Sequence, residues 1–271
     1  MLRTFLKTFQ EIVYVERFSA SNGVLQRIDP RVKLCSITAF ILSAVAVRTV
    51  IPLSILFAAI VALCIVSKIP VKFFFLRTTI FVPIFAAVIA LPLPFITPGV
   101  LLAKVEYGGL VVGITMEGIY RATQFTLKVW VCVASLVLLV LTARFSELVH
   151  VMEKFKFPGV LVTMTAVTYR FIFLFVNEAY RMALAKESRT VTRERWREAV
   201  RSLANMIATL FIRAHERGER VYLAMIARGY AGKVRSLGEM RCANRDWVFV
   251  SASALICFMV LATEYLYLGG W

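Results

Sequence analysis

The sequence is short of acidic residues, of histidine and of the motifs that mark common enzymes. Its 271 residues include 16 Asp and Glu against 32 Lys and Arg, and its two histidines lie far apart. Neither G-x-S-x-G nor H-E-x-x-H occurs, so the hydrolase and zinc-protease signatures are missing. Gly232-Lys233 does not complete a phosphate loop, because Ala227 and Val234 occupy positions that need glycine and Ser or Thr. We therefore expect no enzyme activity.

Cysteine is also poorly placed for a disulfide framework or a metal site. There are five cysteines, an odd number, and no C-x-x-C pair. A buried cysteine in an apolar run behaves as a small hydrophobic residue, and four of the five lie in such runs: Cys35, Cys64, Cys132 and Cys257. We expect no metal site, no cofactor and no intramembrane acidic cluster that could relay protons.

What the chain has in abundance is apolar sequence. It is 60% hydrophobic, with a mean hydropathy of +0.77, and long uncharged runs of this kind predict a polytopic membrane protein. The first 33 residues contain no uninterrupted apolar core, so no cleavable signal peptide is expected. Five membrane spans are predicted, at residues 34–47, 51–66, 73–91, 122–141 and 247–268.

The basic residues set the orientation of these spans. With a cytoplasmic N-terminus, segments 1–33, 68–77 and 143–246 lie inside and hold 28 of the 32 basic residues, whereas the outer segments hold three. The positive-inside rule then places the N-terminus and the 143–246 region in the cytoplasm and the C-terminus outside. A net charge of +16 on so apolar a chain indicates a surface facing anionic lipid rather than a nucleic-acid partner.

Local signals refine the first four spans. Asp29 can cap a helix that starts at Pro30, and Arg31 and Lys33 are expected to mark its cytoplasmic edge. Pro83 predicts a kink in the third span. Lys128 lies inside the fourth span, where a lysine must be paired or must reach the interface. Residues 92–113 are expected to form a loop.

The region 143–246 predicts two long helices. No Pro or Gly interrupts the chain from Phe157-Pro158-Gly159 to Arg189, about 45 Å of helix. The apolar first half of this helix leaves a sixth span open, although Arg170 and Glu178 argue against it. A second helix follows residue 195 and carries an apolar stripe made of Leu203, Ile207, Leu210, Ala214, Val221 and Met225. This stripe should pack against the first helix.

Glycine and arginine mark particular points of this pair. Gly218 stands near a missing stripe position, which predicts a close crossing of the two helices. Arg228-Gly229 ends the second helix, as expected for a left-handed glycine cap with a favourable cation. Ser188-Arg189 ends the first helix. An arginine at a helix tip can also bind carboxylates or helix-end carbonyls of a partner.

Taken together, these stretches resemble the transmembrane T component of energy-coupling factor (ECF) transporters, in particular its CbiQ-like branch. The resemblance runs from about residue 27 to residue 232. It is carried, in chain order, by RIDPRVKL (27–34), LT (141–142), FSEL (145–148), FP (157–158), TYRF (168–171), EAYRM (178–182) and ERVYLAMIARGY (219–230).

The resemblance implies an all-α polytopic membrane helix bundle with a cytoplasmic domain of two long crossed coupling helices. It implies two ABC-type ATPase subunits and a substrate-binding S component in the bilayer as partners. The helix tips of this family dock into grooves of the ATPases through Ala-Arg-Gly-type motifs. Ala227-Arg228-Gly229 keeps that motif, whereas Ser188-Arg189-Thr190 keeps the arginine but has threonine in place of glycine.

The expected domains are 1–142 (an N-terminal interfacial segment and four spans), 143–246 (the coupling helices) and 247–271 (the last span). The implied function is ATP-driven uptake of a metal ion or vitamin across a prokaryotic plasma membrane, with docking through the two tips. The residues expected to build the coupling helices and the opening motif are Tyr169, Arg170, Glu178, Gly218, Glu219 and Arg220, together with Asp29, Pro30, Arg31 and Lys33. The alternatives are a membrane scaffold with a basic lipid-facing domain and a stand-alone permease.

Overall fold

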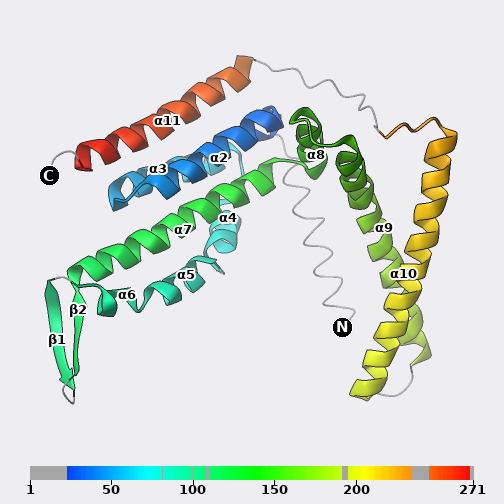
Figure 1. The fold of residues 1–271 in the computed structure, drawn as a ribbon, viewed down its shortest axis with the longest axis horizontal. Helices are drawn as coiled ribbons and strands as arrows, with labels where there is room; N and C mark the ends of the chain where they lie inside the picture. The colour runs from blue at the N-terminus through cyan, green and yellow to red at the C-terminus, as the bar shows by residue number, and fades with distance from the viewer. Residues whose placement is uncertain are drawn as a thin grey trace. The chain divides into compact units, whose positions relative to one another are not determined.

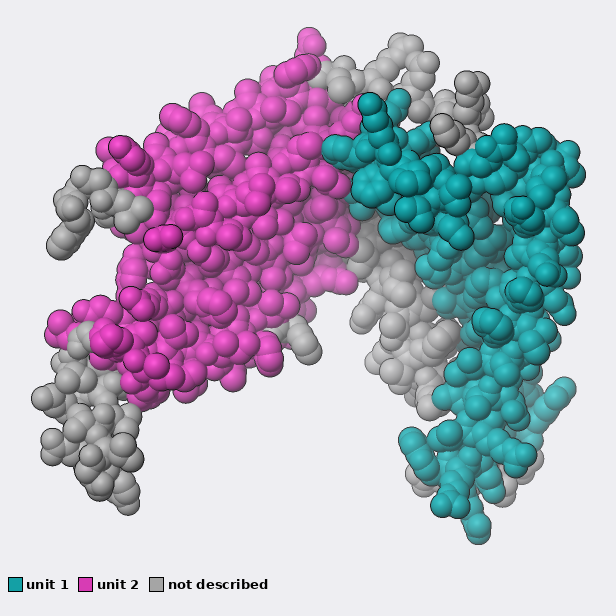
Figure 2. Space-filling model, in the orientation of Figure 1, with its two compact units in different colours: residues 1–14, 145–239 teal, residues 15–144, 240–271 magenta. Residues whose placement is uncertain are grey.

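The computed structural model describes residues 23–80, 82–98, 100–107, 110–190, 195–232 and 244–268. The chain divides into two compact units (Figure 2). We call residues 15–144 and 240–271 the bundle unit and residues 1–14 and 145–239 the helix-pair unit. Residues 145–239 of the helix-pair unit are thus inserted in the chain between the two parts of the bundle unit.

The bundle unit is built around its longest helix, α7 (Met116–Thr142). Ahead of it come η1 (Leu25–Arg27), α2 (Pro30–Ala46), α3 (Val50–Val66), α4 (Val71–Thr79), α5 (Val82–Ala90) and α6 (Leu93–Ile96). Each of the helices α2 to α6 packs against α7, and α11 (Asn244–Leu268) packs on α2 and α3. Figure 1 shows α2, α3, α7 and α11 running along one another.

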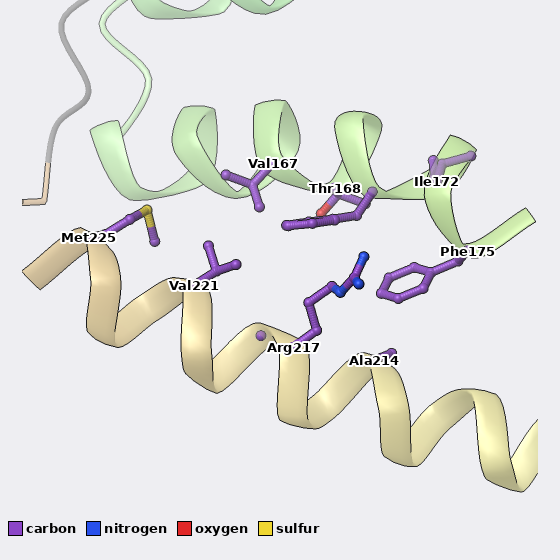
Figure 3. A pocket seen from close by; sticks show the side chains of 10 residues that line it. Val167, Thr168, Ile172, Phe175, Ala214, Arg217, Val221 and Met225 are labelled. Atoms are coloured by element: carbon purple, nitrogen blue, oxygen red, sulfur yellow. The ribbon is translucent and has the colours of Figure 1, made fainter. Parts of the chain in front are cut away.

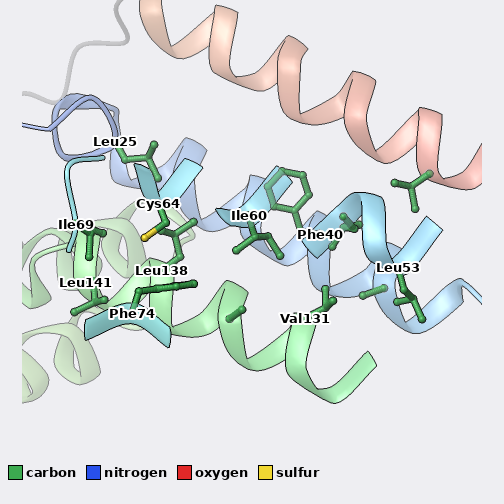
Figure 4. Close-up of a cluster of buried hydrophobic side chains, with 14 of the residues drawn as sticks. Leu25, Phe40, Leu53, Ile60, Cys64, Ile69, Phe74, Val131, Leu138 and Leu141 are labelled. Carbon is green, nitrogen blue, oxygen red and sulfur yellow. The ribbon is translucent and has the colours of Figure 1, made fainter. Parts of the chain in front are cut away.

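Apolar side chains from α2, α3, α4, α7 and α11 meet in one core (Figure 4). Phe40 of α2, Leu53 and Ile60 of α3, and Leu138 of α7 are fully enclosed in it. In lipid, such side chains stabilise the bundle through close van der Waals packing between the helices rather than through removal from water. Many of the remaining apolar side chains of these helices are exposed in the structure, which is the pattern expected of surfaces that face lipid.

The helical membrane fold class is confirmed, and the span count differs from the five that were expected. In the part of the chain that the structure describes, α7, α9 (Gly159–Arg189) and Asn244–Leu266 of α11 are long and apolar enough to cross a membrane. A fourth candidate is the pair Val71–Thr79 and Val82–Ile96, which is bent by 41°. Pro83, at the second residue of α5, lies at this bend, as a proline kink requires.

The expected loop at residues 92–113 was wrong in part. It contains α6 and a β-hairpin in which β1 (Leu101–Tyr107) pairs antiparallel with β2 (Leu110–Thr115). Both segments are rich in aliphatic residues, and Gly108-Gly109 separates them in the sequence. Two glycines between two such runs are a hairpin signal, which the low charge of this stretch obscured.

In the described part of the helix-pair unit there are three helices. α8 (Phe145–Lys154) packs on α9, and α9 packs on α10 (Trp196–Ala227). With 31 and 32 residues, α9 and α10 are each about 45–50 Å long, and they cross in Figure 1. Lys156 has a positive φ of 59° in the turn that precedes Pro158 and α9, so this turn separates α8 from α9.

Candidate functional site

The tip of α10 is a complete Schellman cap. Gly229 has a φ of +81°, a conformation open to glycine and costly for other residues. Its N–H donates to the Ile226 carbonyl at 2.9 Å, and the Tyr230 N–H donates to the Met225 carbonyl at 3.0 Å. This pattern satisfies two of the carbonyls that a helix end leaves free. Ala227, Arg228 and Gly229, at this end of the helix, are exposed.

The tip of α9 ends in a different way. Thr190 follows the helix in an extended conformation, with φ −100° and ψ 105°, because a β-branched residue avoids the left-handed region. Its hydroxyl donates to the Lys186 carbonyl at 2.9 Å, and the Ser188 hydroxyl donates to the Ala185 carbonyl at 3.0 Å. Ser188 and Arg189 are exposed. Threonine therefore caps this end through its side chain, whereas glycine caps α10 through the backbone.

Away from the tips, ring contacts connect α8 to α9, and an ion pair connects α9 to α10. The Tyr169 ring stacks on Phe145 of α8 at 4.1 Å and meets Phe173 edge-on at 5.2 Å, which fixes α8 to α9. Arg213 of α10 forms an ion pair with Glu178 of α9. Three other residues of the expected set do not join the two helices: Arg170 is exposed, Glu219 lies 3.6 Å from His215, and Arg220 lies 3.8 Å from Glu216, both within α10.

The close crossing predicted at Gly218 is wrong. A Cβ added at Gly218 would meet no atom within 4 Å. The residue instead lines an open groove between α9 and α10, with Val167 and Phe175 on one side and Val221 and Met225 on the other (Figure 3). The larger side chains on both helices line the space above the glycine, so the backbones do not close on it.

The apolar stripe of α10 faces α9 over only part of its length. Ala214, Val221 and Met225 line the groove, as the stripe predicts. Leu203 and Ile207, further toward the start of α10, are exposed.

The opening motif lies at the start of α2. The Asp29 carboxylate accepts the Arg31 N–H at 2.9 Å and caps the helix, with Pro30 as its first residue. The Arg31 side chain lies 4.0 Å from the same carboxylate. Lys33, expected at the edge of the bundle, is 0% exposed. Its ammonium donates to the carbonyls of Thr142 at 3.2 Å and Gln26 at 3.4 Å. These hydrogen bonds stabilise the buried charge.

Lys128 is held at the opposite end of α2. Its ammonium donates to the Val45 carbonyl at 2.9 Å and so satisfies one carbonyl of the last turn of α2. The turn between α2 and α3 is also bonded to neighbouring helices, through side chains of α11 and α7. Glu264 accepts the Arg48 N–H at 2.8 Å and the Thr49 hydroxyl at 2.5 Å, and the Tyr120 hydroxyl accepts the Val50 N–H at 3.2 Å.

Asp246 and Glu264, the buried acids of α11, were not predicted from the sequence. Asp246 is 3% exposed and accepts the Asp29 N–H at 3.0 Å, and Glu264 is 7% exposed. The only signal was that each is a carboxylate at one end of an apolar span, where a partner is required. Among the described residues, no group of three or more His, Cys, Asp or Glu could hold a metal ion.

The sequence is similar to known proteins over most of its length. A family model described as cobalt transport protein, CbiQ, matches residues 21–240. A protein of Methanocaldococcus jannaschii without an assigned function is 31% identical over 94% of this chain and 88% of its own length. The EcfT energy-coupling factor transporter transmembrane protein of Listeria innocua is 28% identical over 93% of this chain and 96% of its own. The cobalt transport protein CbiQ of Rhodobacter capsulatus is 29% identical over 64% and 70%.

The protein is thus of the class of multi-pass membrane components of transporters. More particularly, the chain belongs to the CbiQ cobalt transport protein family, and the resemblance to the ECF transporter T component is confirmed.

Proposed function

We propose that this protein is the coupling subunit of an ATP-driven ECF-type importer. In this role α9 and α10 transmit the conformational change of two ABC-type ATPases to a separate substrate-binding S component in the bilayer. The S component, rather than this chain, selects the metal ion or vitamin. The chain itself carries out no catalysis and supplies the coupling free energy between its two partners.

The observation that carries this proposal is the pair of exposed helix tips, each with an arginine. At the α10 tip, the carbonyls of Met225 and Ile226 are bonded within the cap, so the Arg228 side chain is not needed to stabilise the helix end. A guanidinium placed there is available to carboxylates or helix-end carbonyls of a partner. We assign docking to Ala227, Arg228 and Gly229 at this tip and to Ser188 and Arg189 at the other.

Charge supports the orientation that this role needs. Residues 143–246 hold 19 Lys and Arg, and the positive-inside rule assigns such a segment to the cytoplasm, where the ATPases would be. We therefore propose a prokaryotic plasma-membrane protein with a cytoplasmic N-terminus and helix-pair unit. On the same basis we propose three domains, 1–142, 143–246 and 247–271, with the middle one in the cytoplasm.

Co-purification tests the assignment of the tips. The membrane subunit would be expressed with its ATPase pair as wild type, Arg228→Glu, Arg189→Glu and the control Arg201→Glu. Arg201 is also exposed, in the second turn of α10, and belongs to neither tip motif. The readout is the amount of ATPase recovered per membrane subunit in detergent.

Docking through the tips predicts loss of ATPase with the first two variants and normal recovery with Arg201→Glu. Equal loss in all three variants would instead favour a scaffold that binds through its overall charge. If folded wild-type protein recovers no ATPase, a stand-alone permease becomes the better description.

A further inference from the structure

Residues 145–239 of the helix-pair unit are joined to the bundle unit at two places in the chain. One junction follows α7, which ends at Thr142, and the other precedes α11, which starts at Asn244. The contacts described below all lie within the bundle unit. They show that a single short stretch, the start of α2, is bonded to both junctions.

Lys33 binds the first junction. Thr142 is the last residue of α7, and its carbonyl is one of those that a helix end leaves without an intrahelical partner. The Lys33 ammonium donates to this carbonyl at 3.2 Å. Both side chains are almost completely buried, at 0% and 1% exposed. A charged hydrogen bond in such surroundings is stronger than a neutral one on the surface.

Asp29, one helical turn before Lys33, binds the second junction. Its backbone N–H donates to the Asp246 carboxylate at 3.0 Å, and Asp246 lies in the first turn of α11. A carboxylate at this position also interacts favourably with the positive end of the α11 dipole. The two partners are 217 residues apart in the chain.

The same network reaches α3. The Lys33 ammonium also donates to the Gln26 carbonyl at 3.4 Å. The Gln26 side chain in turn accepts the Ser67 hydroxyl at 2.9 Å, and Ser67 follows the last residue of α3. The ends of α3, α7 and α11 are therefore held through the start of α2.

We propose that Asp29, Lys33 and Asp246 form a junction clamp through which displacement of the helix-pair unit reaches the bundle helices. The proposal rests on the function proposed above. Because the end of α7 and the start of α11 are both bonded to the start of α2, the bundle helices move together when the helix-pair unit is displaced. Without these bonds, the same displacement would unwind the last turn of α7 and the first turn of α11. Lys33 and Asp246 are positioning residues in this scheme, since they touch neither ATPase nor substrate.

Hydrogen exchange in lipid nanodiscs tests the clamp. Lys33→Met keeps the length of the side chain and removes the donor, and Asp246→Ala removes the acceptor at the second junction. Asp246→Asn keeps an acceptor oxygen and should restore the wild-type behaviour. Ser36→Ala is the control, because Ser36 bonds Ser253 across α2 and α11 at 3.1 Å without touching a junction.

The first readout is taken on the membrane subunit alone. The Ala143 N–H bonds the Leu139 carbonyl at 2.8 Å in the last turn of α7. Lys33→Met should speed exchange of this amide about tenfold or more, as expected for loss of a hydrogen bond to a charged group. Unchanged exchange at Ala143 would overturn the role of Lys33 at the first junction.

The second readout is taken on the complex with its ATPases, with and without a non-hydrolysable ATP analogue. Wild type and Ser36→Ala should show a nucleotide-dependent change of exchange in α2, α7 and α11. Lys33→Met and Asp246→Ala should recover the ATPases normally and lose this change. If the change persists in both, the clamp is structural only and the proposal is overturned.

Failure of the proposed coupling function and failure of the junction clamp give different results. A wild-type subunit that recovers no ATPase would overturn the proposed function and the transmission role with it, whereas the Ala143 exchange would still report on the bond itself. If Lys33→Met does not fold, the Asp246→Ala and Asp246→Asn pair decides the transmission role.

Discussion

Removing the Glu264 carboxylate should destabilise the bundle. This carboxylate accepts the Arg48 N–H at 2.8 Å and the Thr49 hydroxyl at 2.5 Å, at the turn that joins α2 to α3. It is 7% exposed, so water cannot replace it in Glu264→Ala. Hydrogen bonds to charged groups contribute about 1.5–3 kcal/mol each. Because a membrane-embedded unfolded state finds other partners for the freed donors, we expect the lower end of the sum, about 3 kcal/mol.

The assay is reversible unfolding in mixed micelles, with the free energy of unfolding compared among variants. Glu264→Gln keeps one acceptor oxygen and should lose about half as much, roughly 1.5 kcal/mol. Thr263→Ala is the matched control, because the Thr263 hydroxyl bonds the Val260 carbonyl of its own helix at 2.9 Å and no other partner among the described residues. If Glu264→Ala unfolds within about 0.5 kcal/mol of the wild type, the usual range of an inert surface change, the carboxylate does not hold the turn.

Three further predictions concern single positions. Gly218→Ala should stabilise α10 by about 0.5–1 kcal/mol, because helical glycine is unfavourable and the added Cβ meets nothing within 4 Å; a clear loss in thermal unfolding would mean that a helix closes on it. Gly229→Ala places a side chain at φ +81°, costs about 1–2 kcal/mol, and should speed exchange of the Tyr230 amide at least fivefold; unchanged exchange would contradict the cap. Lys128→Met removes the bond to the Val45 carbonyl and should lower the free energy of unfolding by about 1 kcal/mol, whereas an unchanged value would show that this bond contributes nothing.

The positions of the long helices were predictable because they follow from local signals. Uninterrupted apolar runs located α3, α7 and α11, and the Pro158-Gly159 and Arg228-Gly229 stops located the limits of α9 and α10. The cap at Asp29 was equally local. Each of these features depends on residues within a few positions of one another, so a single sequence is enough to find them.

The pairing of helices was not predictable in this way. Nothing in the sequence near Asp246 or Glu264 indicates that their partners lie more than 200 positions earlier, at Asp29 and at Arg48. Lys33 likewise looks like an interfacial lysine until the Thr142 carbonyl is placed beside it. Gly218 shows the opposite error, since a spacing rule suggested a contact that the groove between α9 and α10 does not contain.

The long sequence separation between α2 and α11 has a consequence for synthesis of the protein. Until the ribosome has made the last span, Asp29 and Ser36 lack their partners Asp246 and Ser253, and Glu264 has not yet reached the turn after α2. A nascent chain therefore carries polar groups whose hydrogen-bond partners in the folded protein lie in its final segment. We expect chains truncated before residue 244 to be degraded rapidly, so that only complete subunits accumulate for assembly.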